Sequence, residues 1–214
     1  MKFAAEAWPL VMPPLLVGIV LLIVGRYVHT GGATGWGIAA LGLALAVLLF
    51  FRDPDRTPPA NPRAVVSPAD GKVIGAETLP DGRQHVAIFL SVFDVHVNRV
   101  PFGGTVDRVT MVPGSYRHAG SAAAAEGNAR CDVAATTAHG NVSWRQVSGL
   151  IARKISCRVR AGTQVRTGDR FGLIYFGSRM DVFMPSTAKL SVTPGARVVA
   201  GETVIAEFPT EEKP

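Results

Sequence analysis

The adjacent residues Gly177 and Ser178 could perform the most unusual chemistry in this 214-residue sequence. The serine hydroxyl can attack the preceding carbonyl in an N→O acyl shift, because glycine has no side chain to block the approach and tolerates strained backbone angles. β-Elimination of the resulting ester would leave dehydroalanine, and hydrolysis would convert that residue into an N-terminal pyruvoyl group. Such a ketone forms a Schiff base with a substrate amine and accepts electrons, as pyridoxal phosphate does. Gly-Ser is also a common turn.

A serine needs a base to become a good nucleophile, and a histidine oriented by a carboxylate is the usual arrangement. His96 follows the apolar run 86–92 and has polar neighbours, so we expect it at the rim of a sheet. Asp70 is a candidate acid, although an Asp-Gly pair is ordinarily a turn former. No group of His, Cys, Asp and Glu has metal-ligand spacing, so we predict no metal. The remaining histidines of this region are interpreted as structural or surface residues: His85, His118 and His139.

An internal repeat around the Gly-Ser pair predicts the fold. Residues 159–174 and 192–207 align at a constant offset of 33. Each copy has glycine at two turns and a β-branched residue on the strand between them, so the copies should pack as a flattened, quasi-symmetric barrel. VSPADGKV at 66–73 is similar to another turn of this type. The aligned positions are Gly162, Val165 and Gly168 in the first copy and Gly195, Val198 and Gly201 in the second.

The repeat spacing resembles the two halves of biotinyl/lipoyl carrier domains. A carrier presents its lysine on the hairpin between the halves, which would fall at about Ser178, whereas the nearest lysine is Lys189. We therefore expect the carrier fold without carrier chemistry, and a mainly β domain with Ser178 at the hairpin tip. Strands are expected at 86–92, 104–112, 141–152 and 154–160, while 121–130 fits a helical turn or a loop equally well.

Two apolar stretches, 8–25 and 36–51, precede this domain. Each is near the lower length limit for a membrane-spanning helix, and the glycine-rich residues between them read as a turn. They predict a helical hairpin that either spans the membrane twice or inserts as a wedge. We expect Pro9, Pro13 and Pro14 to start or kink the first helix. Basic residues after the second stretch place both ends in the cytoplasm, and a cleaved signal peptide is not favoured.

The charge and the cysteine content indicate which binding partners and which cellular compartment to expect. The predicted hairpin domain, 1–56, has four basic and three acidic residues, net +1, and the β-rich domain, 57–214, has 18 and 13, net +5. A basic domain beside a membrane segment suggests attraction to anionic lipid, although +5 is also an ordinary solubility charge. No Lys/Arg run with interleaved aromatics supports nucleic-acid binding. Two cysteines form no disulfide framework and favour a reducing compartment.

Several segments, taken in order, resemble the phosphatidylserine decarboxylase proenzymes in their short bacterial and archaeal form. The resemblance covers nearly the whole chain, and the last segment is the most specific because it contains the Gly-Ser pair. The segments after the apolar hairpin are FRDPDRTPP (51–59), VSPADGKV (66–73), FLSVFDVHVNRVP (89–101), VPGSYRHA (112–119), RQVSGLIARKI (145–155) and RFGLIYFGSRMDVFMP (170–185).

The resemblance implies that the chain cleaves itself after Gly177 and that Ser178 becomes the covalent pyruvoyl cofactor, without a metal or pyridoxal phosphate. The two products, 1–177 and 178–214, would remain together as a heterodimer that could dimerise further.

The resemblance also implies roles for two other residues, with Asp70 as the acid of the self-cleavage triad and His96 as its histidine. The long form has a second histidine three positions later, where this chain has Arg99, so the short form must manage with one.

The implied reaction is decarboxylation of phosphatidylserine to phosphatidylethanolamine through a Schiff base, a step of phospholipid biosynthesis. His96 would return a proton to the α-carbon. The enzyme would lie at the cell membrane, with its catalytic domain on the cytoplasmic face beside anionic lipid and with no nucleic-acid partner. Two alternatives are a membrane-anchored biotinyl/lipoyl-like binding or adaptor module, and a structural membrane protein in which Gly-Ser is only a turn.

Overall fold

The computed structural model describes residues 2–120, 126–150, 154–175 and 178–210. The chain forms two compact units, Met1–Asp55 and Arg56–Pro214, which we call the helical unit and the β unit. The division lies one residue before the predicted boundary. Arg56 belongs to the β unit, where its guanidinium pairs with Asp70 and Glu202.

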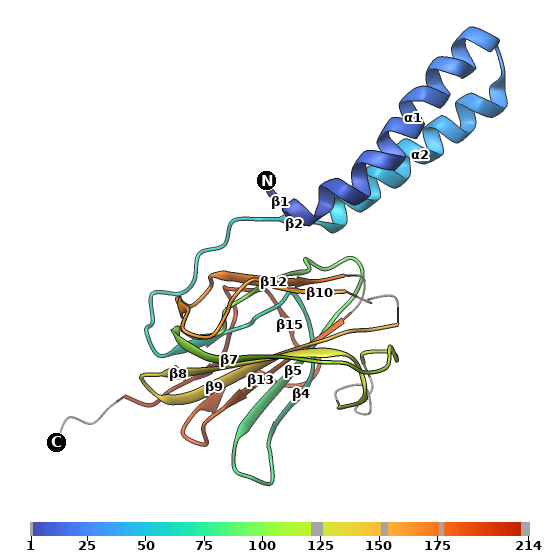
Figure 1. Cartoon of the computed structure of the whole chain (residues 1–214). Helices are drawn as coiled ribbons and strands as arrows, with labels where there is room; N and C mark the ends of the chain where they lie inside the picture. The colour runs from blue at the N-terminus through green and yellow to red at the C-terminus, as the bar shows by residue number, and fades with distance from the viewer. Residues whose placement is uncertain (1, 121–125, 151–153, 176–177, 211–214) are drawn as a thin grey trace. The chain divides into compact units, whose positions relative to one another are not determined.

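The helical unit is a pair of apolar helices, α1 (Trp8–Val28) and α2 (Gly31–Phe50), which lie side by side (Figure 1). Both helices are long and apolar enough to cross a membrane. A short 3-10 turn, η1 (Ala5–Ala7), precedes them, and strands β1 (Lys2–Phe3) and β2 (Arg52–Asp53) pair at the base of the hairpin.

The connection between the helices is shorter than the glycine content predicts, since only His29 and Thr30 separate α1 from α2. Glycines instead serve helix packing: a Cβ on Gly25 would lie 2.3 Å from the Thr34 hydroxyl oxygen. Such small residues let apolar helices approach closely. Pro9 lies in the first turn of α1, as expected. Pro13 and Pro14 lie inside the helix, so they do not start it.

The β unit is built on an eight-stranded antiparallel sheet that curls into half a barrel (Figure 1). Its strands are β4 (Gly71–Thr78), β5 (Gln84–Leu90), β7 (Gly104–Val112), β8 (Arg130–Thr137), β9 (Gly140–Val147), β11 (Gln164–Val165), β13 (Ser178–Met184) and β15 (Arg197–Val198). They are arranged in the order β11-β7-β8-β9-β13-β5-β4-β15.

Two short sheets supply the rest of the hydrophobic core. One contains β6 (Val97–Arg99), β10 (Ile155–Cys157) and β12 (Arg170–Ile174), and the other contains β3 (Ala64–Val66), β14 (Lys189–Leu190) and β16 (Val204–Glu207). Inward side chains of all three sheets form one buried cluster. For example, the rings of Trp144 on β9 and Phe171 on β12 meet edge to face at 5.6 Å.

The internal repeat is present in three dimensions and is longer than the sequence suggested. Its glycine turns all have positive φ, which favours glycine. Each glycine turn donates a backbone hydrogen bond to an earlier segment of the chain, and the acceptor residues of the two copies are also 33 positions apart. These bonds are Gly162 N to Val106 O and Gly195 N to Val73 O, at 2.7 and 2.8 Å, and Gly168 N to Val100 O and Gly201 N to Ser67 O, both at 2.8 Å.

The predicted fold class is confirmed: the chain is mainly β, with a flattened half-barrel and an N-terminal helical pair. Two expected strands are too long, because β9 ends at Val147 and the strand expected at 154–160 is only Ile155–Cys157. Half of the ambiguous segment 121–130 lies outside the described residues, at 121–125.

Candidate active site

One end of the large sheet gathers the residues that the sequence singled out. The strand registers define a row of paired residues across six strands, and the loops beyond that row form what we call the Ser178 end. This end lies opposite the tip of the β4–β5 hairpin (Figure 1). The row consists of Val112, Arg130, Val147, Arg179, Phe89 and Lys72.

Ser178 is the first residue of β13 and pairs with Leu90 of β5. It is fully buried, and its Oγ has no hydrogen-bond partner among the described residues. The expected exposed hairpin tip is therefore wrong. Strands β12 and β13 belong to different sheets, so the chain crosses from a short sheet to the large one just before Ser178. Gly177, the other half of the predicted cleavage site, lies outside the described residues.

His96 is also fully buried, directly before β6. Its Nδ1 lies 2.9 Å from the backbone carbonyl oxygen of Asp94. Because a carbonyl can only accept, Nδ1 carries the proton and Nε2 is the basic nitrogen of the neutral ring. The His96 carbonyl accepts a bond from the Ile174 N–H at 3.4 Å. His96 therefore lies beside the end of the strand that leads to Ser178.

Asp70 lies just before β4, on the other side of β5 from β13. Two strand spacings separate β4 from β13, which is about 10 Å. The Asp70 carboxylate accepts bonds from the Arg56 guanidinium at 3.0 Å and the Ala200 N–H at 2.8 Å. Asp70 is thus held at the Ser178 end by described contacts with two groups other than His96, and its predicted role in orienting that histidine stays a prediction.

Arg99, at the position of the second histidine of the long form, has a structural contact. Its side chain is buried and donates to the carbonyl oxygen of Gly168 at 2.9 Å. It therefore supports the second glycine turn of the first repeat copy.

A group of inward polar residues beside Ser178 was not predicted from the sequence. Gln146 Nε2 donates to Asn98 Oδ1 at 2.8 Å, but Asn98 Nδ2, Gln146 Oε1 and Ser148 Oγ have no partners among the described residues. An unpaired buried polar atom costs about 1–3 kcal/mol. The sequence did hold a signal for this group. Every second residue from Val142 points inward, and the apolar pair Val142 and Trp144 is followed at the same spacing by the polar residues Gln146 and Ser148.

The opposite face of β13 carries a second buried polar group, which we call the outer cluster: His85, Arg179 and Asp181. Asp181 Oδ1 lies 2.8 Å from His85 Nε2, and the Arg179 guanidinium donates to both carboxylate oxygens at 2.8–3.1 Å. Burial raises the pKa of Asp181, but the hydrogen bonds from His85 and Arg179 more than offset this, so the net pKa lies below its ordinary value. His85 is therefore held within this buried cluster, and the structural or surface role expected of it stays a prediction.

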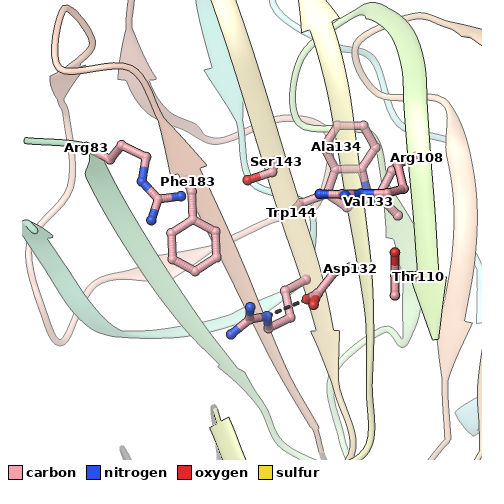
Figure 2. A pocket seen from close by; sticks show the side chains of 10 residues that line it. Arg83, Arg108, Thr110, Asp132, Val133, Ala134, Ser143, Trp144 and Phe183 are labelled. Atoms are coloured by element: carbon pink, nitrogen blue, oxygen red, sulfur yellow. Dashed lines mark hydrogen bonds and ion pairs between the residues drawn. The ribbon is translucent and has the colours of Figure 1, made fainter. Parts of the chain in front are cut away.

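A groove of about 400 Å³ lies on this outer face, lined by arginines around Phe183 (Figure 2). The guanidinium carbons of Arg83 and Arg145 lie 5.3 and 5.5 Å from the centre of the Phe183 ring. The groove's acid, Asp132, is already paired with Arg130 and Arg145. We place the chemistry at the Ser178 end because the groove's hydroxyl and carboxylate groups include no buried nucleophile.

The described residues contain no group of three His, Cys, Asp or Glu side chains that could hold a metal ion. The two cysteines, Cys131 and Cys157, are free thiols. A hydrogen bond from Cys131 lowers the pKa of Cys157 to about 7.

Comparisons with known proteins identify the family to which this fold and site belong. A family model described as phosphatidylserine decarboxylase matches residues 43–206. The chain is similar to proteins named phosphatidylserine decarboxylase proenzyme from Ralstonia nicotianae (41% identity over 211 residues, 96% of this chain and 95% of the relative) and Chlorobium phaeobacteroides (43% over 172 residues, 78% and 81%). A third relative of that name, from Oleidesulfovibrio alaskensis, is 44% identical over 180 residues, 80% of this chain and 82% of its own.

The chain therefore belongs to the phosphatidylserine decarboxylase family, as its sequence motifs indicated.

Proposed function

We propose that the chain is a proenzyme that cleaves itself before Ser178 and then decarboxylates phosphatidylserine to phosphatidylethanolamine. The observation that carries this proposal is Ser178 itself, a fully buried serine with an unpaired hydroxyl, next to a strand flanked by a buried histidine. A carrier domain would need its modified residue exposed, so this burial disfavours the carrier alternative. The name proenzyme, carried by the relatives, supports a cleavage step.

Self-cleavage would use only groups of this chain and water. His96 Nε2 removes the Ser178 hydroxyl proton while Oγ bonds to the Gly177 carbonyl carbon, and that proton passes to the serine nitrogen as the peptide C–N bond breaks. Loss of the Ser178 α-proton then breaks the Cβ–O bond and releases the Gly177 carboxylate. Water replaces the remaining nitrogen, which leaves as ammonia, and position 178 becomes a pyruvoyl group.

The surroundings of Ser178 fit such a group. An enclosed site excludes water from reactive carbonyl chemistry, and Ser178 is fully buried. The pyruvoyl ketone would supply Schiff-base chemistry, accepting electrons from the substrate bond that breaks as CO2 leaves. His96, fixed through Nδ1, would return a proton to the substrate carbon from Nε2.

The cleaved chains would remain one particle. Residues 178–214 begin with β13, which is hydrogen-bonded to β5 on one side and β9 on the other. Both neighbours belong to the 1–177 fragment, so the ladder holds the small chain in the middle of the large sheet. We propose this heterodimer as the working enzyme.

The helical unit would hold the enzyme at the cell membrane, where its lipid substrate lies. Its two helices have the length and composition of membrane spans. Basic residues after the second apolar stretch favour a cytoplasmic position for the β unit, whose net positive charge suits anionic lipid.

Intact-mass measurement of the purified protein tests this proposal. We expect two chains, of residues 1–177 and 178–214, with the smaller lacking a free amino group. Their masses should sum to that of the uncleaved chain plus one water minus one ammonia, whereas ordinary proteolysis would add the water alone. A single 22.6 kDa chain from material with decarboxylase activity would contradict the proposal.

A further inference from the structure

The exposed apolar side chains of the β unit gather in one place. Among its described residues, every large apolar side chain that is exposed lies in the loops of the Ser178 end or, for Met111, one residue inside the row that borders them. Phe93 is 84% exposed and Leu150 is 63% exposed. Scattered apolar residues are normal on a surface, but a concentration at one end marks an interaction site. We call this group the apolar rim: Val92, Phe93, Met111, Tyr116 and Leu150.

The charged groups around the rim favour an anionic partner. Lys72, Arg117 and Lys154 are exposed at this end, and the Lys154 ammonium lies over the ring of Tyr175 at 5.4 Å. The acidic Glu126 is also exposed, but the carboxylate of Asp94 is bound by the backbone and hydroxyl of its own loop and by Arg197 at 3.2 Å. Apolar side chains interspersed with Lys and Arg are typical of surfaces that rest on anionic lipid.

A cleft of about 260 Å³ opens among these residues. Met111, Tyr116 and Ile155 line it together with Ser148, which is only 1% exposed. The cleft therefore extends from the apolar rim toward the buried strand end beside Ser178.

We propose that the apolar rim rests on the surface of an anionic lipid bilayer and opens the cleft toward it. This inference depends on the proposed function, because it describes how the substrate would reach Ser178. A bilayer suits the rim better than a protein partner does, since basic groups surround the apolar side chains and the same chain carries two helices apolar enough for a membrane.

The test is a double variant of the full chain, Phe93→Ser with Leu150→Ser, compared with Leu79→Ser in the turn at the other end of the sheet. Decarboxylation is measured on phosphatidylserine in phosphatidylglycerol vesicles and on a short-chain phosphatidylserine that stays monomeric in water. Loss of two apolar side chains that would insert into the bilayer should raise KM on vesicles at least about tenfold. Turnover of the monomeric substrate, self-cleavage and the Leu79→Ser control should not change.

Each other outcome overturns the rim proposal. Vesicle kinetics that match the unchanged protein would mean that the rim binds something else, such as a second copy of the chain if sedimentation then shows altered assembly. An equal loss on both substrates would mean that the two side chains shape the site itself. Failure of the proposed function would look different, because the unchanged protein would then be uncleaved or inactive on both substrates.

A second inference comes from the unpaired hydroxyls. The β9–β13 register ends with Val147 paired with Arg179, and extending it by one residue would place Ser148 opposite Ser178. Directly opposed residues of an antiparallel pair point the same way, with Cβ atoms about 5 Å apart. Both Oγ atoms are buried without partners among the described residues. Two hydroxyls so placed can reach each other by a change of rotamer or through one water molecule.

We infer that Ser148 is a positioning residue for self-cleavage, which also rests on the proposed function. Its hydroxyl donates a hydrogen bond to Ser178 Oγ and holds that oxygen for attack on the preceding carbonyl, while the Ser178 proton stays available to His96. His96 can then remove the proton from a nucleophile already fixed in place. Ser148 itself forms no bond to the reacting carbon.

Pulse-labelled proenzyme made in a cell-free system tests this role, with the rate of chain cleavage followed on gels. Ser148→Ala should slow cleavage about tenfold, and Ser148→Thr, which restores the hydroxyl, should recover most of the rate. Ser143→Ala, on the outer face of the same strand, is the matched control. Normal cleavage of Ser148→Ala, or no rescue by Ser148→Thr in a folded protein, would overturn the inference. Cleavage of Ser178→Ala would instead contradict the proposed function.

Discussion

The two faces of strand β13 differ in how their buried polar groups are bound: the carboxylate on the outer face is fully hydrogen-bonded, although His85 Nδ1 beside it has only the Glu77 carboxylate, at 3.5 Å, in the described part of the chain. On the outer face, both carboxylate oxygens of Asp181 are bound, by Arg179 and His85. On the inner face, the hydroxyls of Ser178 and Ser148 have no partners among the described residues. A satisfied cluster gains structure from its bonds, whereas unsatisfied groups cost stability and persist where function needs them. A buried His–Asp pair is therefore the less informative of the two as a sign of catalysis.

The largest expected effect comes from removing the unpaired hydroxyl of Ser178 on the inner face. Ser178→Ala should abolish both chain cleavage and decarboxylation, since the residue that follows the scissile Gly177 carbonyl would then have no hydroxyl. The melting temperature should stay the same or rise, because the substitution removes an unpaired buried hydroxyl. Gel analysis, activity assay and thermal unfolding check these points together. Ser186→Ala, in the exposed turn after β13, is the control and should cleave normally. A cleaved Ser178→Ala protein would show that the site is elsewhere.

The next effect is on the outer face, where stability and not chemistry should suffer. Asp181→Asn removes the buried carboxylate that pairs with the Arg179 guanidinium, which should lower the free energy of unfolding by about 3–5 kcal/mol. Denaturant titration measures the change. Asp132→Asn, which breaks the partly exposed pairs of the outer groove (side chains 21–32% exposed), should cost less than Asp181→Asn, about 1 kcal/mol. Protein that still folds should cleave itself at the normal rate, and a specific loss of cleavage would give Asp181 a role in the chemistry.

The lowered pKa of Asp181 makes a pH-dependent contribution to stability. A carboxyl whose pKa is lower in the folded than in the unfolded chain stabilises the fold fully above the unfolded value, about 3.9. This contribution is lost as the pH falls from there through the lower folded pKa. Unfolding titrations between neutral and strongly acidic pH should therefore show a steeper acid loss in the unchanged protein than in Asp181→Asn. Parallel curves for the two proteins would mean that Asp181 is not held ionised.

The contrast between the two faces also explains what the sequence could predict. The Gly-Ser pair and the repeat at offset 33 were predictable because each depends on local chain chemistry: a hydroxyl beside a carbonyl, and glycines at positive φ. The burial of Ser178 was not, because it depends on β13 lying between β5 and β9, whose residues are distant in sequence. Asp181 and His85 are 96 residues apart, and no local pattern reveals such a pair.

The smallest expected effect is a change of stability at Arg83, which lies at the edge of the outer face and outside its buried cluster. Arg83 is half-exposed, pairs with Asp81 two residues away, and stacks on Phe183 (Figure 2). Arg83→Ala should lower the free energy of unfolding by less than about 1 kcal/mol, since an exposed cation–π contact contributes about 0.5–1 kcal/mol. Cleavage and decarboxylation should be unaffected. Denaturant titration and the activity assay check this. A marked loss of activity with normal stability would mean that the arginine groove takes part in the reaction. We do not expect this, because Phe183 lies five residues along β13 from Ser178.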